Sequence, residues 1–359
     1  MPYSHLTPQD ANAILVAHLP EPPTELPVVR PLESTDADPA ARARFQTYLV
    51  YCASGSKSTP YYLITLQSSE PLQGEGETAL SAPNSLRAQY ALQSALHAHL
   101  IVVASSTGPT SLPFPVPMAL NVETSRPYIL ARLAVPLTRP SSPLRPLAAV
   151  RGSLPPERVA LLDLHLGVAL RTLHNLQSEW CGPPALESEG LYSWQEAFTL
   201  LVEESLSAAE SAGIASADDV SALRSYLGRA IGAFLFDDVE VPSLVALTTA
   251  AESAFITDVD GEPQLALLLP SFAHLLYGDP LLERAFSPSE TPSKALLEGY
   301  GAPPPIVFAR QRTKRMWYDL YLGLVVLLGV KRVGGDQNMD WAVQLVEHNR
   351  VLLKDAPCY

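Results

Sequence analysis

Acidic and histidine side chains that could carry catalysis are found between residues 250 and 275. Glu252 could act as a catalytic acid, and His274 could transfer protons if it faces a cleft. Asp258 and Asp260 carry the oxygen ligands that Mg²⁺ prefers, although no partner acid lies near them in the sequence. The pattern favours a structural interpretation for all four: a solvated loop glutamate, two turn-capping aspartates and a packed or surface histidine.

Other polar groups are also more typical of structure than of catalysis. His174 ends an apolar helix face, so we expect a hydrogen-bonded packing histidine rather than a base. No Gly-x-Ser-x-Gly, glycine-rich phosphate loop or Cys-x-x-Cys is present. One basic cluster is predicted to solvate a helix start, with recognition of an acidic ligand as the alternative. It consists of Arg310, Arg312, Lys314 and Arg315.

Composition narrows the class of protein. The chain has 359 residues, of which 47% are hydrophobic, so it can bury a sizeable core and is predicted to form two domains or lobes. Its 37 acidic residues outnumber 24 basic ones, which argues against nucleic-acid or membrane partners. Three cysteines are too few for a disulfide framework or a zinc site. No bilayer-spanning run or secretory signal is visible, so we expect a cytoplasmic protein.

Periodicity divides the chain into three parts. Residues 1–133 are predicted to form an N-terminal lobe with a β-sheet and one helix, and 134–156 a proline-rich seam. Residues 157–359 are predicted to form a helical C-terminal lobe with a small β-hairpin near 255–268. The expected strands are 46–52, 61–67, 101–104, 118–122 and 126–133. The expected helices are 85–100, 156–177, 193–212, 217–236, 310–333 and 340–353.

Several segments follow one another in a recognisable order. They are Leu244-Val245, Phe255-Ile-Thr-Asp258, Leu276-Tyr-Gly-Asp-Pro-Leu-Leu-Glu283, Gly299-Tyr-Gly301 and Trp317-Tyr-Asp-Leu-Tyr-Leu322. Their order and spacing resemble the aminoglycoside-phosphotransferase-like family, especially its fungal branch. The resemblance implies an α+β, two-lobed protein-kinase-like fold.

The same resemblance implies that the residues of phosphoryl transfer are replaced. That reaction needs a lysine for the phosphates, a helix acid that holds this lysine, an Asp that orients the acceptor hydroxyl, and an Asn and a second Asp for magnesium. No lysine lies between Lys57 and Lys294. We therefore expect no magnesium–ATP site, no other cofactor and no metal. The family positions fall on Thr65 (lysine), Gln89 (helix acid), Thr248 or Thr249 (catalytic Asp), Ser253 or Ala254 (Asn) and Ser271 (second Asp), the alternatives depending on the anchoring motif.

Three functions remain open from the sequence. The first is a pseudokinase whose inter-lobe cleft binds a small, largely apolar molecule or a protein partner, in secondary metabolism. Small neutral side chains at the family positions favour apolar guests over nucleotides. The second is an enzyme that uses the old cleft for a cyclisation or isomerisation. The third is a small-molecule kinase with displaced residues such as Glu252 or Asp258.

Overall fold

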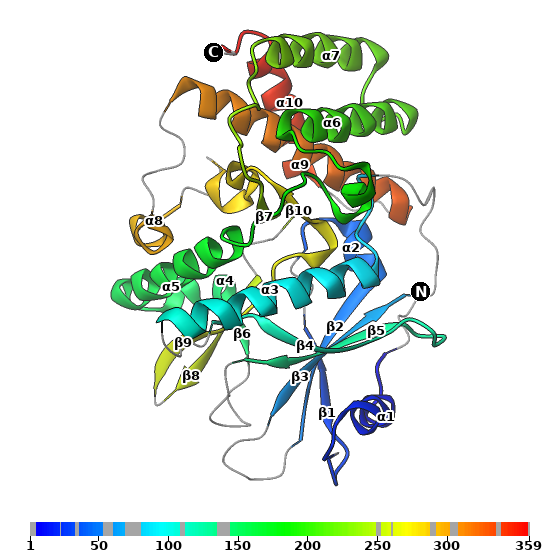
Figure 1. The fold of residues 1–359 in the computed structure, drawn as a ribbon, viewed down its shortest axis with the longest axis vertical. Helices are drawn as coiled ribbons and strands as arrows, with labels where there is room; N and C mark the ends of the chain where they lie inside the picture. The colour runs from blue at the N-terminus through cyan, green and yellow to red at the C-terminus, as the bar shows by residue number, and fades with distance from the viewer. Residues whose placement is uncertain are drawn as a thin grey trace.

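Two lobes make up the computed structural model: a β-sheet at one end and a larger body of helices at the other (Figure 1). None of the helices among the described residues is both long and apolar enough to cross a membrane. The structure describes residues 5–21, 23–32, 36–52, 60–68, 80–107, 112–134, 144–248, 253–259, 261–287, 292–301, 308–334 and 339–357.

An antiparallel sheet in the order β1-β2-β3-β5-β4 forms the N-terminal lobe. Phe45–Tyr51 (β2) pairs along its whole length with Tyr61–Gln67 (β3), which confirms the strands predicted at 46–52 and 61–67. Alternating apolar residues cover both faces of this sheet. One face packs against α1 (Pro8–His18), and the other packs against Phe255 and Leu267 of the C-terminal lobe. The other strands are Val28–Pro31 (β1), Pro115–Asn121 (β4) and Tyr128–Leu133 (β5).

The predicted helix after residue 85 is longer than expected. It is α3, Leu86–Thr107, and it includes the segment 101–104 that was predicted as a strand, so that prediction is wrong. Between Ser85 and Gly108 the sequence has no glycine or proline that would end the helix. Ile101 and Val102 are 54% and 68% exposed, so these β-branched side chains need no sheet partner.

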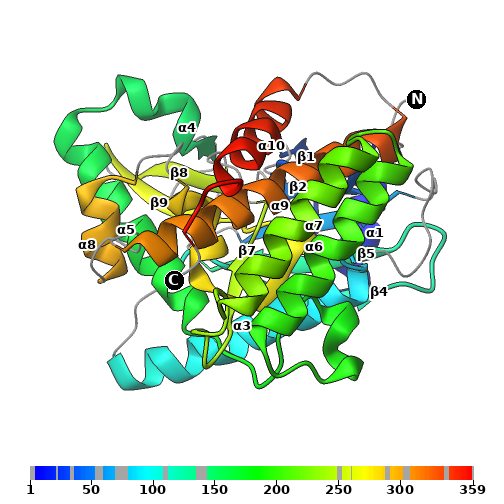
Figure 2. The same cartoon turned by 90° about the horizontal axis from the view of Figure 1, so that it is seen from above.

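Helices build the C-terminal lobe around one large core, and Figure 2 shows α6 and α10 against α9, with α7 beside α6. The aromatic residues Trp317, Tyr318 and Tyr321 of α9 are buried there. All five predicted helices of this lobe are confirmed. They are Pro156–His174 (α5), Trp194–Ser211 (α6), Ala217–Gly232 (α7), Ala309–Val333 (α9) and Asp340–Leu353 (α10).

Two small sheets lie beside the helices. Ala254–Val259 (β8) pairs with Glu262–Leu268 (β9) around Gly261, whose φ of 86° suits a tight turn. Arg145–Pro146 (β6) adds to β8 and leads into a short helix, Leu147–Val150 (α4). Ser243–Ala246 (β7) pairs with Leu275–Gly278 (β10). An unpredicted helix, Lys294–Tyr300 (α8), packs on α5.

The described part of residues 1–133 contains three helices rather than the one that was predicted, because α1 and one further helix are present besides α3. This further helix joins the two lobes. The six residues Pro39–Arg44 (α2) lie between β1 and β2 in sequence, yet they pack against α9 (Figure 1). Asp38 begins this helix, with its carboxylate accepting the amide hydrogens of Ala40 and Ala41 at 3.0 and 3.2 Å. The Asp38 carboxylate also lies directly against Gly329 of α9, where any side chain would collide with it.

Candidate functional site

Residues of the N-terminal lobe occupy the junction between the lobes. The Thr248 hydroxyl donates a hydrogen bond to the Ser271 hydroxyl at 2.9 Å, and Ser271 in turn donates to the carboxylate of Asp36. The amide of Ala37 donates to the Thr248 carbonyl at 2.9 Å. The segment between β1 and α2 is therefore seated directly on two positions that the family resemblance assigns to phosphoryl transfer.

His274 makes a second contact with the same segment. Its Nε2 lies 2.7 Å from Oδ2 of Asp38, and both side chains are buried. Burial alone would lower the pKa of His274, but the hydrogen bond and charge of Asp38, together with the charge of Asp36, outweigh it and raise the pKa. His274 is thus a packed histidine whose charged form is held by an acid from the other lobe.

Asp36 is also enclosed. Its Oδ1 accepts the amide of Asp38 at 2.7 Å, and its backbone carbonyl accepts from Arg42 at 3.0 Å. Burial raises the pKa of the Asp36 carboxyl, and the nearby charge of Asp38 raises it further, against the lowering effect of His274. A buried acid in this place offers no positive charge to a phosphate, and it withholds Ser271 from any ligand.

The space on the N-terminal side of this junction is small. A cavity of about 80 Å³ borders Thr65, Gln89 and Ser271, which is the volume of two or three waters at about 30 Å³ each. The Thr65 hydroxyl lies 3.0 Å from that of Thr47, and Gln89 Nε2 donates to the carbonyl of Asn84 at 3.0 Å. The side chains at the lysine and helix-acid positions are therefore committed to partners within their own lobe.

The remaining predicted residues do not converge on a metal. Ser253 and Ala254 are buried, and Asp258 forms a 2.7 Å ion pair with Arg145 at the surface. Among the described residues, no group of three or more His, Cys, Asp or Glu side chains could hold a metal ion. Thr249, Glu252 and Asp260, with Ala250 and Ala251, lie outside the described residues.

Only part of the basic cluster is the solvated patch that the sequence suggested, because Arg312 is exposed and Arg310 is partly exposed. Lys314 and Arg315 are only 2% and 1% exposed. Lys314 is ion-paired with Asp279 and with Asp238, and Arg315 is ion-paired with Asp319. The charges serve to hold α9 in the core, because the acids that neutralise them come from α9 itself and from the segments before β7 and after β10.

His174 is a packing residue, as predicted. Its Nδ1 lies 2.8 Å from the Tyr300 hydroxyl, and its Nε2 lies 3.4 Å from Oε2 of Glu283. Glu283 Oε2 also accepts the amide of Ala246 at 3.1 Å. Glu283 therefore ties the end of α5 to strand β7.

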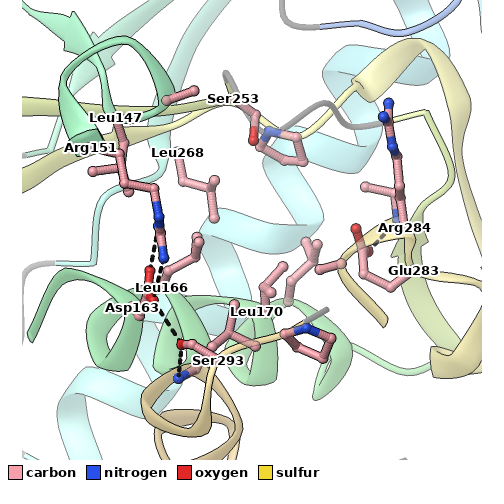
Figure 3. Close-up of a pocket in the computed structure, with 17 residues that line it drawn as sticks. Leu147, Arg151, Asp163, Leu166, Leu170, Ser253, Leu268, Glu283, Arg284 and Ser293 are labelled. Carbon is pink, nitrogen blue, oxygen red and sulfur yellow. Dashed lines mark hydrogen bonds and ion pairs between the residues drawn. The ribbon is translucent and has the colours of Figure 1, made fainter. Parts of the chain in front are cut away.

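A larger cavity, of about 400 Å³, lies within the C-terminal lobe (Figure 3). Of the predicted site residues that the structure describes, only Ser253 lines this cavity, and Thr248 and Ser271 lie elsewhere, at the junction of the lobes. Both are almost fully buried against Asp36. Six leucines from α4, α5, α8 and β9 give the cavity an apolar wall: Leu147, Leu166, Leu170, Leu173, Leu268 and Leu296.

Polar groups sit at two ends of this cavity. Figure 3 shows Arg151, Asp163 and Ser293 linked at one end, with Glu283 and Arg284 at the other. Sequence reasoning missed the cavity because α8, which closes one side, was not predicted. The helix-start signal of Ser293, whose hydroxyl accepts the amide of Leu296 at 3.1 Å, could have revealed it.

The fold is shared with solved structures of small-molecule kinases. The GDP complex of aminoglycoside 2'-phosphotransferase-IIIa is 12% identical with a TM-score of 0.51, covering 90% of this chain and 92% of that one. An ethanolamine kinase from Plasmodium vivax is 9% identical with a TM-score of 0.51, covering 90% and 82%. A protein named as an aminoglycoside phosphotransferase from Ralstonia eutropha JMP134 is 11% identical with a TM-score of 0.54, covering 96% and 95%. These likenesses confirm the two-lobed kinase-like fold.

Sequence comparison alone does not extend this result. No model of a known protein family matches the chain, and no curated protein matches its sequence.

Proposed function

We propose that this chain is a kinase-like protein without phosphotransferase activity, and that it binds a small, largely apolar molecule in the cavity of its C-terminal lobe. The observation that carries the first part is the hydrogen bond from Ser271 to Asp36. A triphosphate with magnesium needs cations and free oxygen ligands. The chain instead presents a buried acid and a serine that is already bonded to it.

The residues around this contact support the same conclusion. Thr65 and Gln89 offer no charge to a phosphate, and the space beside them is about 80 Å³. That is well below the roughly 300–1,000 Å³ of ordinary small-molecule sites. The C-terminal cavity, at about 400 Å³, falls within that range. Its leucine-rich wall favours a hydrocarbon guest, because each buried apolar contact gains free energy without a polar partner.

The experiment is a thermal-shift and calorimetric titration of the whole chain. Mg²⁺–ATP at millimolar concentration should leave the melting temperature unchanged, whereas a neutral apolar probe, N-phenylnaphthylamine, should raise it by mass action. Leu170→Phe places extra volume in the cavity wall and should abolish probe binding. Leu161→Phe on the same helix is the matched control, since Leu161 is exposed and lies outside the cavity.

Two results would contradict this proposal. A magnesium-dependent stabilisation by ATP would show that nucleotide displaces the Asp36 segment. Failure of the wild-type chain to bind the apolar probe would move the function to a partner-binding scaffold.

A further inference from the structure

We propose that the ligand of the C-terminal cavity is an electrically neutral, elongated molecule, mostly hydrocarbon, that enters past the Arg151–Asp163 ion pair from an outer groove. This inference rests on the proposed function, because it concerns the same cavity, and it adds the charge, the shape and the route of the ligand.

Neutrality is inferred from the pairing of the charges in the cavity wall. Asp163 accepts hydrogen bonds from both terminal nitrogens of Arg151, at 2.7 and 2.6 Å, and from the Ser293 hydroxyl at 2.7 Å. Because each charge already has its partner, a charged ligand would have to break an ion pair or remain buried without a counter-charge. Either event costs several kcal/mol.

At the other end of the cavity, the charged groups also contact other residues of the protein. Glu283 is bonded to the amide of Ala246 and lies beside His174. The guanidinium of Arg284 lies over the ring of Trp341, 4.9 Å from its centroid. Both charged groups of this end thus contact the protein itself, Glu283 through hydrogen bonds and Arg284 through an aromatic face. Between the two ends, the wall is made of leucines, so the site offers a ligand apolar contact rather than charge.

The route is inferred from a second hollow that adjoins the first. An open groove lies between the 3-10 helix 151–153, the start of α5 and the start of α8. Its lining includes Leu154, Val159 and Lys294. The groove and the cavity share Ala148, Arg151, Asp163 and Ser293. The ion pair therefore stands at the boundary between the cavity and the more open groove.

Its two members differ in freedom. The side chain of Arg151 is 42% exposed, whereas that of Asp163 is 2% exposed. Asp163 is fixed by three hydrogen bonds, while the long arginine side chain can swing into solvent. A molecule longer than the cavity can then keep its apolar part among the leucines and extend its remainder into the groove, which defines an elongated ligand.

The test compares two fluorescent probes that share one ring system. N-phenylnaphthylamine is neutral, and anilinonaphthalene sulfonate adds one negative charge. The wild-type chain should bind the neutral probe at least about tenfold more tightly, a difference of about 1.4 kcal/mol. Loss of binding in Leu170→Phe, but not in Leu161→Phe, places the probe in the cavity. Equal affinity for the sulfonate would overturn the neutral-ligand inference while leaving the proposed function intact.

Stopped-flow measurements with the neutral probe test the route. The double variant Arg151→Met, Asp163→Leu replaces the ion pair by apolar groups without leaving a buried charge. Association and dissociation rates should both rise about tenfold, with Kd unchanged. A changed Kd with an unchanged association rate would overturn the route. If the double variant is unstable, Arg151→Lys takes its place. This variant keeps the charge but not the two-point geometry, so the association and dissociation rates should rise by less than in the double variant. If neither probe binds the wild-type chain, the proposed function fails with this inference.

Discussion

The imidazole of His274 and the carboxylate of Asp38 form a buried ion pair that bridges the two lobes, with Nε2 2.7 Å from Oδ2. Removing one member of such a pair leaves an uncompensated buried charge, which costs about 3–5 kcal/mol. The pair is thus a main determinant of how firmly the segment before α2 is held.

This pair makes stability depend on pH. The pKa of His274 is raised above its ordinary value of 6.5, so its contribution is complete below pH 6.5 and is lost as pH rises through the raised pKa. The free energy of unfolding, measured by urea denaturation, should therefore fall over that upper window. His274→Gln should remove this dependence, and a slope that survives in the variant would assign it to other groups.

Asp36 adds a second dependence at lower pH. Burial raises the pKa of its carboxyl above the ordinary 3.8, so the protonated form is favoured in the folded state. Its contribution is present below pH 3.8 and is lost as pH rises through the raised pKa. Asp36→Asn should flatten this lower window and leave that of His274 in place. The same urea titrations, repeated on the variant, separate the two.

Ser271→Asp should not restore a magnesium site. The new carboxylate would face that of Asp36, because Ser271 donates directly to Asp36. We expect the variant to lose about 1–3 kcal/mol of stability. Asp36→Asn in the same chain should recover most of the loss, and Ser271→Asn, the neutral analogue, should cost less. Independent effects of the two substitutions in a double-mutant cycle would contradict this contact.

Gly329→Ala should weaken the packing of α2 against α9 and destabilise the chain. A methyl group at residue 329 would collide with the carboxylate of Asp38 and approach the amide of Ala40. Overpacking of this kind costs about 1–3 kcal/mol. Gly228→Ala in α7 is the matched control: nothing lies near the added methyl group, so the higher helix propensity of alanine should stabilise the chain by about 0.5–1 kcal/mol. Thermal unfolding of both variants measures the difference.

Lys314→Met should be strongly destabilising. The lysine is ion-paired with Asp279, whose Oδ2 also accepts the Tyr318 hydroxyl at 2.8 Å. Its removal leaves Asp279 buried and uncompensated, at a cost of about 3–5 kcal/mol. Arg312→Met on the exposed side of the same helix should change stability by less than about 0.5 kcal/mol. Similar losses in both variants would mean that the cluster acts through surface charge.

Local patterns in the sequence predicted most of the regular structure. The leucine spacing of α5 is a consequence of burial on one face of the helix, whereas 46–52 and 61–67 carry apolar residues on both faces because both faces of their sheet are covered. The error at 101–104 arose because β-branched residues favour strands only where a sheet is available to pair with them. The signal for α2 was present, since Asp38 precedes Pro39 in the manner of an N-cap and first helical residue.

The candidate site was harder to predict, because its contacts join distant residues. Thr248 and Ser271 lie at the junction of the lobes, but nothing in their own segments indicates that Asp36 is bonded to Ser271. The burial of Lys314 depends on Asp279, which belongs to another segment. A local charge pattern records which charges are present, whereas their solvation is decided by tertiary packing.

The position of α2 also bears on motion. Proteins that close around a ligand by hinge bending need lobes joined only by a few pliable residues. Here a helix from the small lobe is docked on α9, and Asp38 holds His274 of the large lobe. The two lobes are therefore expected to open and unfold as one cooperative body, with amide hydrogens of β2 and α9 exchanging at similar rates. The junction would then make the fold a rigid frame for the cavity within its larger half.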